Sequence, residues 1–313
     1  MGTSAGKPPV LLTRKLPASV MARLEAACEV EQCPGDGSAA HAELVSRVAG
    51  KQALVSMVTD TVNRAVIEAG DALRIIANVA VGYNNVDVAA ARERGIIVTN
   101  TPDVLTDATA DLTLALILAV TRRLGEGERW LRRGDWPGWA FDQLLGMQLR
   151  GKQLGIVGFG RIGRAVAARA AVFGMTIAHT SRSDAGMPLD RLLATSDVVS
   201  LHVPLTPETR HLIGQPELAR MKRTAYLINT TRGPVVDEAA LAWALKNRLI
   251  AGAGLDVYER EPEVHADLFP LENVVLAPHL GSATTETRTA MADLAVRNVI
   301  AVLGGDPPLT PVT

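Results

Sequence analysis

Arg232, Glu261 and His279 carry the groups of this chain that are suited to acid–base and anion-binding chemistry. An imidazole changes its charge near neutral pH, and a guanidinium fork binds a planar carboxylate through two hydrogen bonds. Each residue follows an apolar segment typical of a buried strand, although each taken singly is also typical of a surface turn. Open α/β sheets bind their ligands at the carboxyl ends of the strands. The position of all three residues at such ends therefore predicts an active site.

A glycine-rich loop precedes these residues in the chain. Gly158–Gly163 reads G-F-G-R-I-G, directly follows the apolar segment Leu154–Val157 and opens a helical pattern. In such a loop Gly158 permits a tight turn, Gly160 lets a diphosphate approach the backbone, and Gly163 lets helix and strand pack closely. Free N–H groups at the helix start then receive the phosphates. The loop in this context predicts a dinucleotide site.

The end of the next strand, Thr176–His179, bears on which dinucleotide binds. An NAD enzyme usually places a carboxylate there for the ribose hydroxyls. Here Ser181, Arg182 and Ser183 follow, with no acid at the strand end, and a guanidinium flanked by hydroxyls suits a 2′-phosphate. We therefore expect NADPH, with NADH as a weaker alternative. A longer strand would bring Asp184 to the ribose instead.

Alternating strands and helices must position these residues. Helices are expected at Ala18–Ala27, Thr61–Ala69, Val86–Arg94, Thr106–Arg123, Glu238–Leu249 with Asp237 as its N-cap, and Thr285–Leu303. Strands are expected at Val10–Thr13, Ala53–Val58, Arg74–Val79, Ile96–Thr99, Leu154–Val157, Thr176–His179, Val198–Val203, Tyr226–Asn229, Gly254–Val257 and Val274–Ala277. This alternation predicts parallel sheets covered by helices on both faces.

Length and pattern together predict two domains. The 313 residues exceed one ordinary domain, and a hydrophobic content of 48% suffices for two cores. We expect an α/β protein with two doubly wound parallel sheets. Residues 1–101, completed by 285–313, would form a flavodoxin-like substrate-binding domain, and residues 102–284 a Rossmann NAD(P)-binding domain.

Composition excludes several kinds of partner. The net charge of −1 gives no reason to expect nucleic acid or an anionic membrane. Leu112–Val120 is the most apolar stretch and is far shorter than the roughly 20 residues of a membrane span. Two cysteines, Cys28 and Cys33, favour a reducing, cytoplasmic location with free thiols. No metal site is expected.

Several motifs, taken in order, resemble the D-isomer-specific 2-hydroxyacid dehydrogenase family and, within it, the glyoxylate and hydroxypyruvate reductases. The resemblance runs from about Val10 to Pro308. Besides the glycine loop, it rests on Val81–Asp87, Leu201–Leu205, Asn229–Gly233, Leu255–Pro262 and Pro278–Thr284.

This resemblance implies an enzyme that reduces a small 2-keto acid, glyoxylate or hydroxypyruvate, to glycolate or D-glycerate. His279 would donate a proton to the oxygen as hydride reaches the carbon. Glu261 would hydrogen-bond the imidazole, fix its tautomer and favour its charged form. Arg232 would hold the substrate carboxylate and polarise the carbonyl. Backbone N–H groups of Val81 and Gly82 would bind the carboxylate from the first domain.

Further cofactor contacts are implied by the resemblance alone. Asp256 would lie near the nicotinamide carboxamide, and Thr230 and Pro204 near the ribose. For these residues a strand-end cap or a loop proline remains an alternative, because position rather than chemistry supports them. The other cofactor contacts implied are Arg161, Ile162, Val203, Thr209, Thr231 and Gly281.

Two tryptophans lie in an irregular segment after the long helix. Trp136 and Trp139 are interpreted as core residues, because tryptophan buries a large area. Alternatively Trp139 reaches the substrate pocket, its own or that of a neighbouring subunit. The family resemblance suggests a homodimer built on the helix Thr106–Arg123.

Two rival interpretations share this fold. A phosphite dehydrogenase carries a lysine where Val81 stands, and valine cannot bind a phosphite dianion. A non-catalytic binding protein, such as a transcriptional corepressor of this fold, carries a long tail that is not expected here. Turnover of glyoxylate would separate the enzyme from the binding protein.

Overall fold

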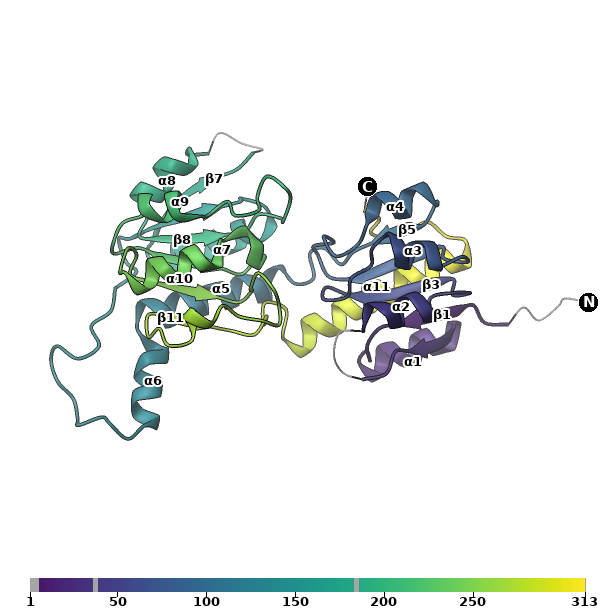
Figure 1. The fold of residues 1–313 in the computed structure, drawn as a ribbon, viewed down its shortest axis with the longest axis horizontal. Helices are drawn as coiled ribbons and strands as arrows, with labels where there is room; N and C mark the ends of the chain where they lie inside the picture. Colours follow the sequence, from purple (N-terminus) through teal and green to yellow (C-terminus); the bar gives the residue numbers. More distant parts are fainter. Residues whose placement is uncertain (1–5, 36–38, 183–185, 313) are drawn as a thin grey trace, which may run out of the picture. The chain divides into compact units, whose positions relative to one another are not determined.

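The chain folds into two α/β units in the computed structural model, which describes residues 6–35, 39–182 and 186–312. Unit 1 comprises Met1–Leu105 and Thr284–Thr313, and unit 2 comprises Thr106–Ala283 (Figure 1). Both sheets are parallel and both are covered by helices on their two faces. The predicted fold class of two doubly wound sheets is confirmed.

Unit 1 has, within its described residues, a five-stranded parallel sheet in the order β2-β1-β3-β4-β5. This order is the flavodoxin-like one. Its strands are β1 (Pro9–Leu12), β2 (Glu29–Gln32), β3 (Ala53–Met57), β4 (Ile75–Val79) and β5 (Ile97–Thr99). Its helices are α1 (Ala18–Ala27), α2 (His41–Arg47), α3 (Arg64–Ala69), α4 (Val88–Glu93) and α11 (Thr285–Gly304).

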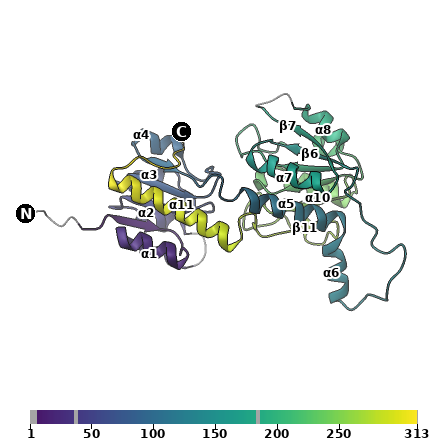
Figure 2. The ribbon, with the colours of Figure 1, turned by 180° about the vertical axis from the view of Figure 1, so that it is seen from behind.

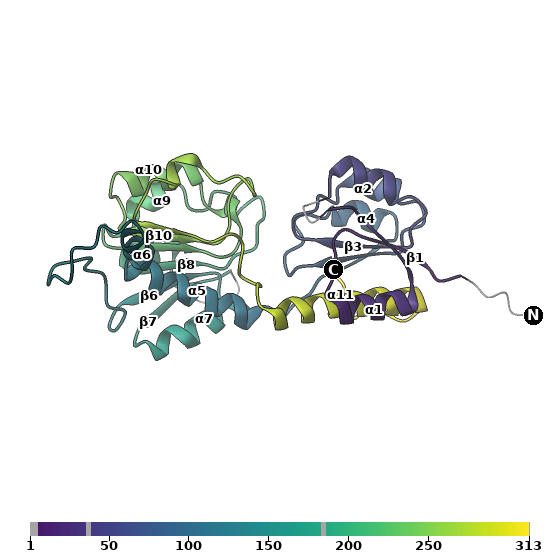
Figure 3. The same cartoon turned by 90° about the horizontal axis from the view of Figure 1, so that it is seen from below.

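Consecutive residues of each central strand alternate between two cores of unit 1, one on each face of the sheet. Val10 and its counterparts on β3 and β4 pack against α1 and α11, whereas Leu11 and its counterparts pack against α2, α3 and α4. Figure 3 shows α1 and α11 on one face of this sheet, with α2 and α4 on the other. Strands buried on both faces explain the continuous apolar runs of the sequence.

Unit 2 has, within its described residues, a six-stranded parallel sheet in the order β11-β10-β9-β8-β6-β7. Its strands are β6 (Gln153–Val157), β7 (Thr176–Thr180), β8 (Val198–Leu201), β9 (Tyr226–Asn229), β10 (Gly252–Leu255) and β11 (Val274–Leu276). Its helices are α5 (Thr106–Thr121), α6 (Leu124–Arg132), α7 (Arg161–Val172), α8 (Leu189–Thr195), α9 (Gln215–Arg220) and α10 (Glu238–Lys246), with 3-10 turns η1 (Gly233–Val235) and η2 (Ala266–Leu268).

Helices α5 and α7 cover one face of the unit 2 sheet, and α8, α9 and α10 cover the other. Figure 2 shows α5 and α7 side by side. Arg169 of α7 bonds Asp111 at 2.5 Å and Asp107 at 2.8 Å, both on α5. On β10, a Cβ at Gly254 would lie 3.1 Å from Cβ of Leu116, so this glycine allows α5 to pack closely on the strand.

Helix α10 begins where the sequence predicts and ends earlier. Asp237 is its N-cap, as expected, and its Oδ1 accepts a hydrogen bond from the Ala240 N–H at 2.9 Å. The helix ends at Lys246 because Arg248 has a left-handed backbone with φ 55°. Strand β2 and helices α2, α6, α8 and α9 were not predicted from the sequence; each is short or has few buried residues.

Helix α6 and the loop after it form an arm, residues 124–146, that extends from the body of unit 2 (Figure 1). The left-handed backbone of Arg123, with φ 53°, separates α5 from α6. Trp139 and Phe141 on this arm are 80% and 86% exposed, and Trp136 is also exposed. The interpretation of Trp136 and Trp139 as core residues of this chain is therefore wrong.

The three glycines of the loop between β6 and α7 have different surroundings. Gly158 has φ 95°, and a Cβ there would lie 2.6 Å from the carbonyl oxygen of His202. A Cβ at Gly163 would press into the carbonyl oxygen of Gly158, far inside contact distance. A Cβ at Gly160 would meet no atom within 4 Å. Gly158 and Gly163 are thus required by packing, whereas Gly160 is not.

Replacing these glycines by alanine should separate packing from open space. We expect Gly163→Ala to destabilise unit 2 by about 2 kcal/mol, which lowers Tm by roughly 4–8 °C, because the helix must move off the strand. Gly160→Ala should leave Tm unchanged, since φ is −79° and space is open. Thermal unfolding without cofactor checks both variants. Equal Tm losses would contradict the packing argument.

Candidate active site

His279 and Glu261 form a hydrogen-bonded pair at the carboxyl edge of the unit 2 sheet. Nδ1 of His279 lies 2.8 Å from Oε2 of Glu261. His279 comes just after β11 and Glu261 follows β10, so two neighbouring strands deliver the pair. The backbone of His279 has φ 54°, a left-handed conformation that is uncommon for residues other than glycine. The pairing predicted from the sequence is present in this structure.

The surroundings of Glu261 favour its ionised form. Burial by itself would raise the pKa of this carboxyl. The hydrogen bond and charge of His279, the Tyr258 N–H at 3.1 Å and the charge of Arg232 outweigh burial, so the pKa lies below its usual value. An ionised carboxylate can only accept hydrogen bonds. Nδ1 of His279 therefore carries the proton of this bond, which leaves Nε2 for other chemistry.

Asp256 fixes the loop that carries His279. Its side chain is fully buried, and its two carboxylate oxygens accept the N–H groups of Leu280 at 2.6 Å and Gly281 at 2.8 Å. Burial raises the pKa of Asp256, and these N–H groups oppose the shift. The His279 N–H donates to the Asp256 carbonyl at 2.9 Å. Thr109 of α5 adds a bond to the Gly281 carbonyl at 3.1 Å.

Arg232 stands in the turn after β9, shaped by a residue that the sequence analysis did not select. The buried Asn229 donates from Nδ2 to the Arg232 carbonyl at 3.0 Å and accepts from the Thr231 N–H at 3.1 Å. Burial lowers the pKa of the Arg232 guanidinium, and the charge of Glu261 opposes that shift. A desolvated guanidinium favours an anionic ligand, and a carboxylate matches its fork.

The turn that carries Arg232 is pressed against the segment that leads to Glu261. A Cβ on Gly233 would fall inside the backbone of Tyr258 and Glu259, well below contact distance. Glycine is therefore required at this position. This contact joins the two loops directly, so the positions of Arg232 and Glu261 depend on each other.

The loop between β6 and α7 has the features of a diphosphate site. Gly160 is the N-cap of α7. Its carbonyl accepts the Arg164 N–H at 3.0 Å, so the helix begins directly after this glycine. Helix starts present N–H groups without a helical partner, and the helix dipole favours an anion there. The open space at Gly160 leaves room for that anion beside the backbone. Of the two predicted contacts that follow, Arg161 is exposed and Ile162 is half-buried. The open space and the N–H groups at the start of α7 together make this loop fit a dinucleotide.

The other predicted cofactor contacts lie along the ends of β8 and β9. Thr231 donates to the Val203 carbonyl at 2.5 Å, and Thr209 donates to the Pro204 carbonyl at 2.6 Å. Thr230 is buried, and its hydroxyl lies 3.0 Å from that of Thr113. These bonds fix the backbone of both strand ends beside the glycine loop.

The end of β7 differs from its predicted chemistry in one respect. Ser181 is half-buried and Arg182 is exposed, while Ser183 and Asp184 lie outside the described residues. The pKa of Glu208 is lowered most by a hydrogen bond with Thr206, and the positive charge of Arg182 lowers it further. Arg182 thus has an acidic neighbour, which comes from the loop after β8 rather than from its own strand end.

Val81 and Gly82 lie in unit 1, in the turn after β4. Nδ2 of Asn100 donates to the Val81 carbonyl at 2.8 Å, and Nδ2 of Asn78 donates to the Gly82 carbonyl at 3.1 Å. Asn85 bonds Asn78 in turn at 3.2 Å. The Val81 carbonyl shares its peptide group with the Gly82 N–H, so Asn100, which the sequence analysis did not select, fixes the direction of that N–H. The Val81 N–H belongs to the peptide group of the Ala80 carbonyl, which accepts the Thr101 N–H at 2.8 Å. Trp139, on the arm of unit 2, is the remaining predicted substrate contact.

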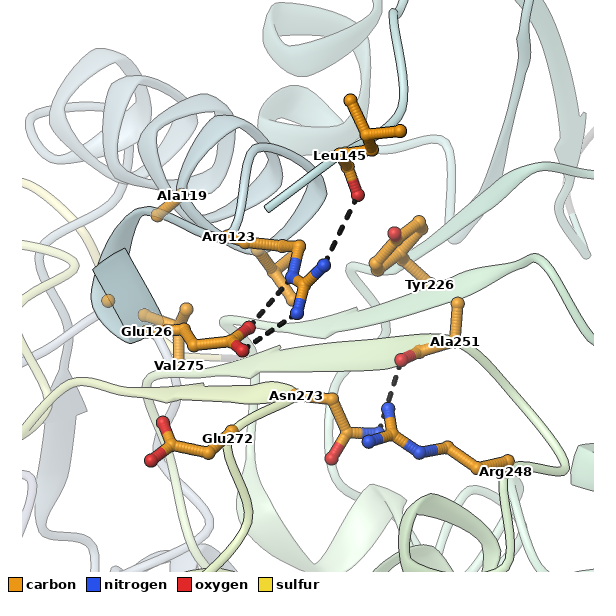
Figure 4. Close-up of a pocket in the computed structure, with 12 residues that line it drawn as sticks. Ala119, Arg123, Glu126, Leu145, Tyr226, Arg248, Ala251, Glu272, Asn273 and Val275 are labelled. Carbon is orange, nitrogen blue, oxygen red and sulfur yellow. Dashed lines mark hydrogen bonds and ion pairs between the residues drawn. The ribbon is translucent and has the colours of Figure 1, made fainter. Parts of the chain in front are cut away.

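A cavity of about 270 Å³ lies at the opposite, amino-terminal edge of the unit 2 sheet, beside Tyr226 and Ala251 (Figure 4). Arg123 is bound there by both oxygens of Glu126 at 2.7 and 2.8 Å and by the Leu145 carbonyl at 3.5 Å. This cavity therefore belongs to the junction between α5 and the arm and is separate from the His279 site.

Two kinds of feature are absent from the part of the chain that the structure describes. Across residues 6–35, 39–182 and 186–312, no three His, Cys, Asp or Glu side chains are grouped to hold a metal ion. In the same residues, no helix has the length and apolar character needed to cross a membrane.

Known proteins similar to this chain share its organisation. Residues 114–281 match the family model of the D-isomer specific 2-hydroxyacid dehydrogenase NAD binding domain. A glyoxylate reductase from Thermococcus litoralis is 49% identical over 316 residues, which cover 96% of each protein.

Two solved structures are similar over almost their whole length. A glyoxylate reductase from Paecilomyes thermophila has a TM-score of 0.89 at 33% identity and covers 98% of this chain and 99% of its own. An NADPH-dependent glyoxylate/hydroxypyruvate reductase from Sinorhizobium meliloti, in complex with NADP and malonate, has a TM-score of 0.87 at 38% identity and covers 98% and 97%. With its dinucleotide loop and its paired His279 and Glu261, the chain belongs to the D-isomer specific 2-hydroxyacid dehydrogenase family and is an oxidoreductase that uses a nicotinamide dinucleotide.

Proposed function

We propose that this enzyme reduces glyoxylate, hydroxypyruvate or both to glycolate or D-glycerate, with NADPH as the preferred donor. The observation that carries the proposal is the His279–Glu261 pair, 2.8 Å apart, beside the desolvated guanidinium of Arg232. An acid and an anion-binding group together suit a substrate that has a carbonyl next to a carboxylate. The names of the similar glyoxylate reductases support glyoxylate as the 2-keto acid substrate.

His279 is the proton donor in this proposal. Its Nδ1–H donates to Glu261, so the Nε2–H of the charged ring is the proton given to the substrate oxygen. The bound dinucleotide supplies the hydride. Glu261 holds the ring in one tautomer and stabilises its positive charge, a role that needs an ionised carboxylate. In the reverse reaction the neutral ring accepts the same proton.

Arg232 holds the substrate carboxylate from unit 2, and the N–H groups of Val81 and Gly82 bind it from unit 1. Unit 1 is therefore the substrate-binding domain, and unit 2 the dinucleotide-binding domain. The bond from Asn100 to the Val81 carbonyl supports this role for the Gly82 N–H, and the bond from the Thr101 N–H to the Ala80 carbonyl supports it for the Val81 N–H, because each fixes the peptide group that carries the donor.

The dinucleotide would bind at the edge of the sheet where the strand order reverses, between β6 and β8. Gly158, Gly160 and Gly163 would hold its diphosphate. Asp256 and Gly281 would hold its nicotinamide end. The remaining contacts come from Arg161, Ile162, Val203, Pro204, Thr209, Thr230 and Thr231.

The preference for NADPH rests on the side chains after β7. Arg182 and Ser181 bind the 2′-phosphate, together with Ser183. The carboxylate of Glu208 near Arg182 opposes a second anion, so the preference is smaller than the guanidinium alone would give. The NADP complex of the Sinorhizobium meliloti enzyme supports this choice of cofactor.

The arm supports a homodimer. Trp139 and Phe141 are almost fully exposed there, and Leu124, Leu131 and Leu145 are each at least 60% exposed. Large apolar side chains exposed together on one segment are typical of interaction surfaces. In the dimer Trp139 reaches the substrate pocket of the neighbouring subunit. The free, buried thiols of Cys28 and Cys33 agree with a cytoplasmic location.

Removing the carboxylate of Glu261 should move the pH dependence of reduction. Glu261→Gln keeps the shape and one hydrogen bond but loses the charge, so the high-pH limb of kcat/KM for glyoxylate should move to lower pH. NADPH affinity should change little. His279→Ala should lower kcat roughly 10²–10⁴-fold. The control is Glu263→Gln, an exposed carboxylate two residues away, which should leave the profile in place. An unmoved limb in Glu261→Gln would rule out the paired donor.

Removing Arg182 should discriminate between the two cofactors. A charged hydrogen bond to phosphate contributes about 1.5–3 kcal/mol, so Arg182→Ala should raise the KM for NADPH about 10–100-fold and the KM for NADH far less. Arg191→Ala, an exposed arginine on α8, is the matched control. Steady-state kinetics with each cofactor measure the ratio. If both KM values rise equally, Arg182 does not bind the phosphate.

Shortening Trp139 should widen the range of substrates. Trp139→Ala should raise kcat/KM for 2-keto acids with bulkier side chains relative to glyoxylate, with little loss of Tm because the indole is exposed. Trp243→Ala on α10 removes a half-exposed indole outside the arm and serves as control. A large loss of Tm in Trp139→Ala with unchanged substrate preference would contradict the assignment of Trp139 to the substrate pocket. Sedimentation of both variants reports the oligomeric state.

A further inference from the structure

Glu238 is a buried carboxylate that the proposed reaction does not use. It is the first residue of α10 and is 6% exposed. Its Oε2 accepts the Glu259 N–H at 2.8 Å, and its Oε1 accepts the His265 N–H at 2.7 Å. These two residues bracket the segment that contains Glu261. One carboxylate thus binds both ends of the loop that carries the partner of His279.

The bonds around Glu238 continue to the turn that carries Arg232. The Glu238 N–H donates to Oε2 of Glu259 at 3.3 Å, so the two glutamates bond each other's backbone. Oε1 of Glu259 lies 2.6 Å from Nε2 of His211, and the His211 N–H donates to the Pro234 carbonyl at 2.8 Å. The close contact of Gly233 with Tyr258 and Glu259 joins the same two loops.

A neutral side chain of the same shape cannot replace this carboxylate. Glu238 faces two N–H donors, one at each oxygen. Glutamine has one acceptor oxygen and one NH₂ group, so one of the two backbone donors would face another donor. A carboxylate at the first turn of a helix is also stabilised by the helix dipole. These two donors explain why a side chain with two acceptor oxygens stands in a buried place, where an unpaired polar group is costly.

We propose that Glu238 is a positioning residue that holds Glu261 at hydrogen-bond distance from His279 by fixing both ends of their shared loop. This inference rests on the proposed role of the His279–Glu261 pair. Glu238 acts through the backbone, because its carboxylate oxygens accept the Glu259 and His265 N–H groups. Three charged groups face Glu261 itself, namely His279, Arg232 and Asp256.

Glu238→Gln tests the proposal, with Glu261→Gln measured beside it. A displacement of about 1 Å in a catalytic group can cost on the order of 10²-fold, so kcat for glyoxylate should fall about 10–100-fold. The KM for NADPH should not change. The high-pH limb of kcat/KM should move to lower pH, in the direction of the Glu261→Gln variant. Because Glu238 acts through Glu261, the double variant should be no slower than Glu261→Gln alone.

Asp237→Ala is the matched control. It removes the neighbouring carboxylate, the N-cap of the same helix, without touching the loop. It should lower Tm but leave the pH limb in place. Amide hydrogen exchange of residues 259–265 should become faster in Glu238→Gln and not in Asp237→Ala. His265→Pro removes one of the two donors from the other side, at a backbone φ of −57° that proline accepts, and should act like Glu238→Gln.

The results distinguish the two hypotheses. If Glu261→Gln moves the limb but Glu238→Gln and His265→Pro do not, the positioning role is overturned and the proton donor stands. Additive losses in the double variant, or equal effects of Asp237→Ala, also overturn it. If Glu261→Gln itself leaves the limb unmoved, the assignment of His279 fails, and the role of Glu238 fails with it.

Discussion

The hydrogen bond between His279 and Glu261 is the constraint that the architecture of unit 2 satisfies. Both residues stand on loops beyond the ends of parallel strands, where the sheet no longer pairs their backbones. A bond of 2.8 Å between two such loops requires that each loop be fixed independently. Buried carboxylates do this on both sides. Asp256 binds two N–H groups of the His279 loop, and Glu238 binds two N–H groups of the Glu261 loop.

Fixing loops by buried carboxylates has an electrostatic consequence. Each anion is costly away from water, and each is stabilised because it accepts two backbone donors that the loop would otherwise leave unpaired. The burial cost is visible in the raised pKa of Asp256, which its N–H partners reduce. Glu261 differs, since its cationic neighbours lower its pKa despite burial. Neighbouring cations thus lower the pKa of Glu261, whereas backbone N–H groups oppose the raised pKa of Asp256.

Local sequence patterns predicted much of this arrangement, and the failures have physical causes. Apolar runs located the central strands, because strands buried on both faces need them. Strand β2 was missed because its residues, Glu29–Gln32, are largely polar and lie at a sheet edge. The candidate site residues Arg232, Glu261 and His279 were selected by their place after strands. Glu238 was not, because its partners are 21 and 27 residues away, and only the fold brings them together. Trp139 was expected to be buried because tryptophans usually are. Its indole is exposed instead, because the arm that carries it extends from the body of unit 2.

The two units contribute different kinds of group to the proposed chemistry. The titratable groups assigned to proton transfer or carboxylate binding belong to unit 2, and the neighbours that shift the pKa values of Arg232 and Glu261 belong to the same unit. Unit 1 offers neutral backbone donors at Val81 and Gly82, whose peptide groups are fixed by the bonds of Thr101 and Asn100 to the Ala80 and Val81 carbonyls. Backbone amide groups do not titrate, so these donors keep the same charge as the pH changes. The pH dependence of the proposed reaction therefore originates in unit 2.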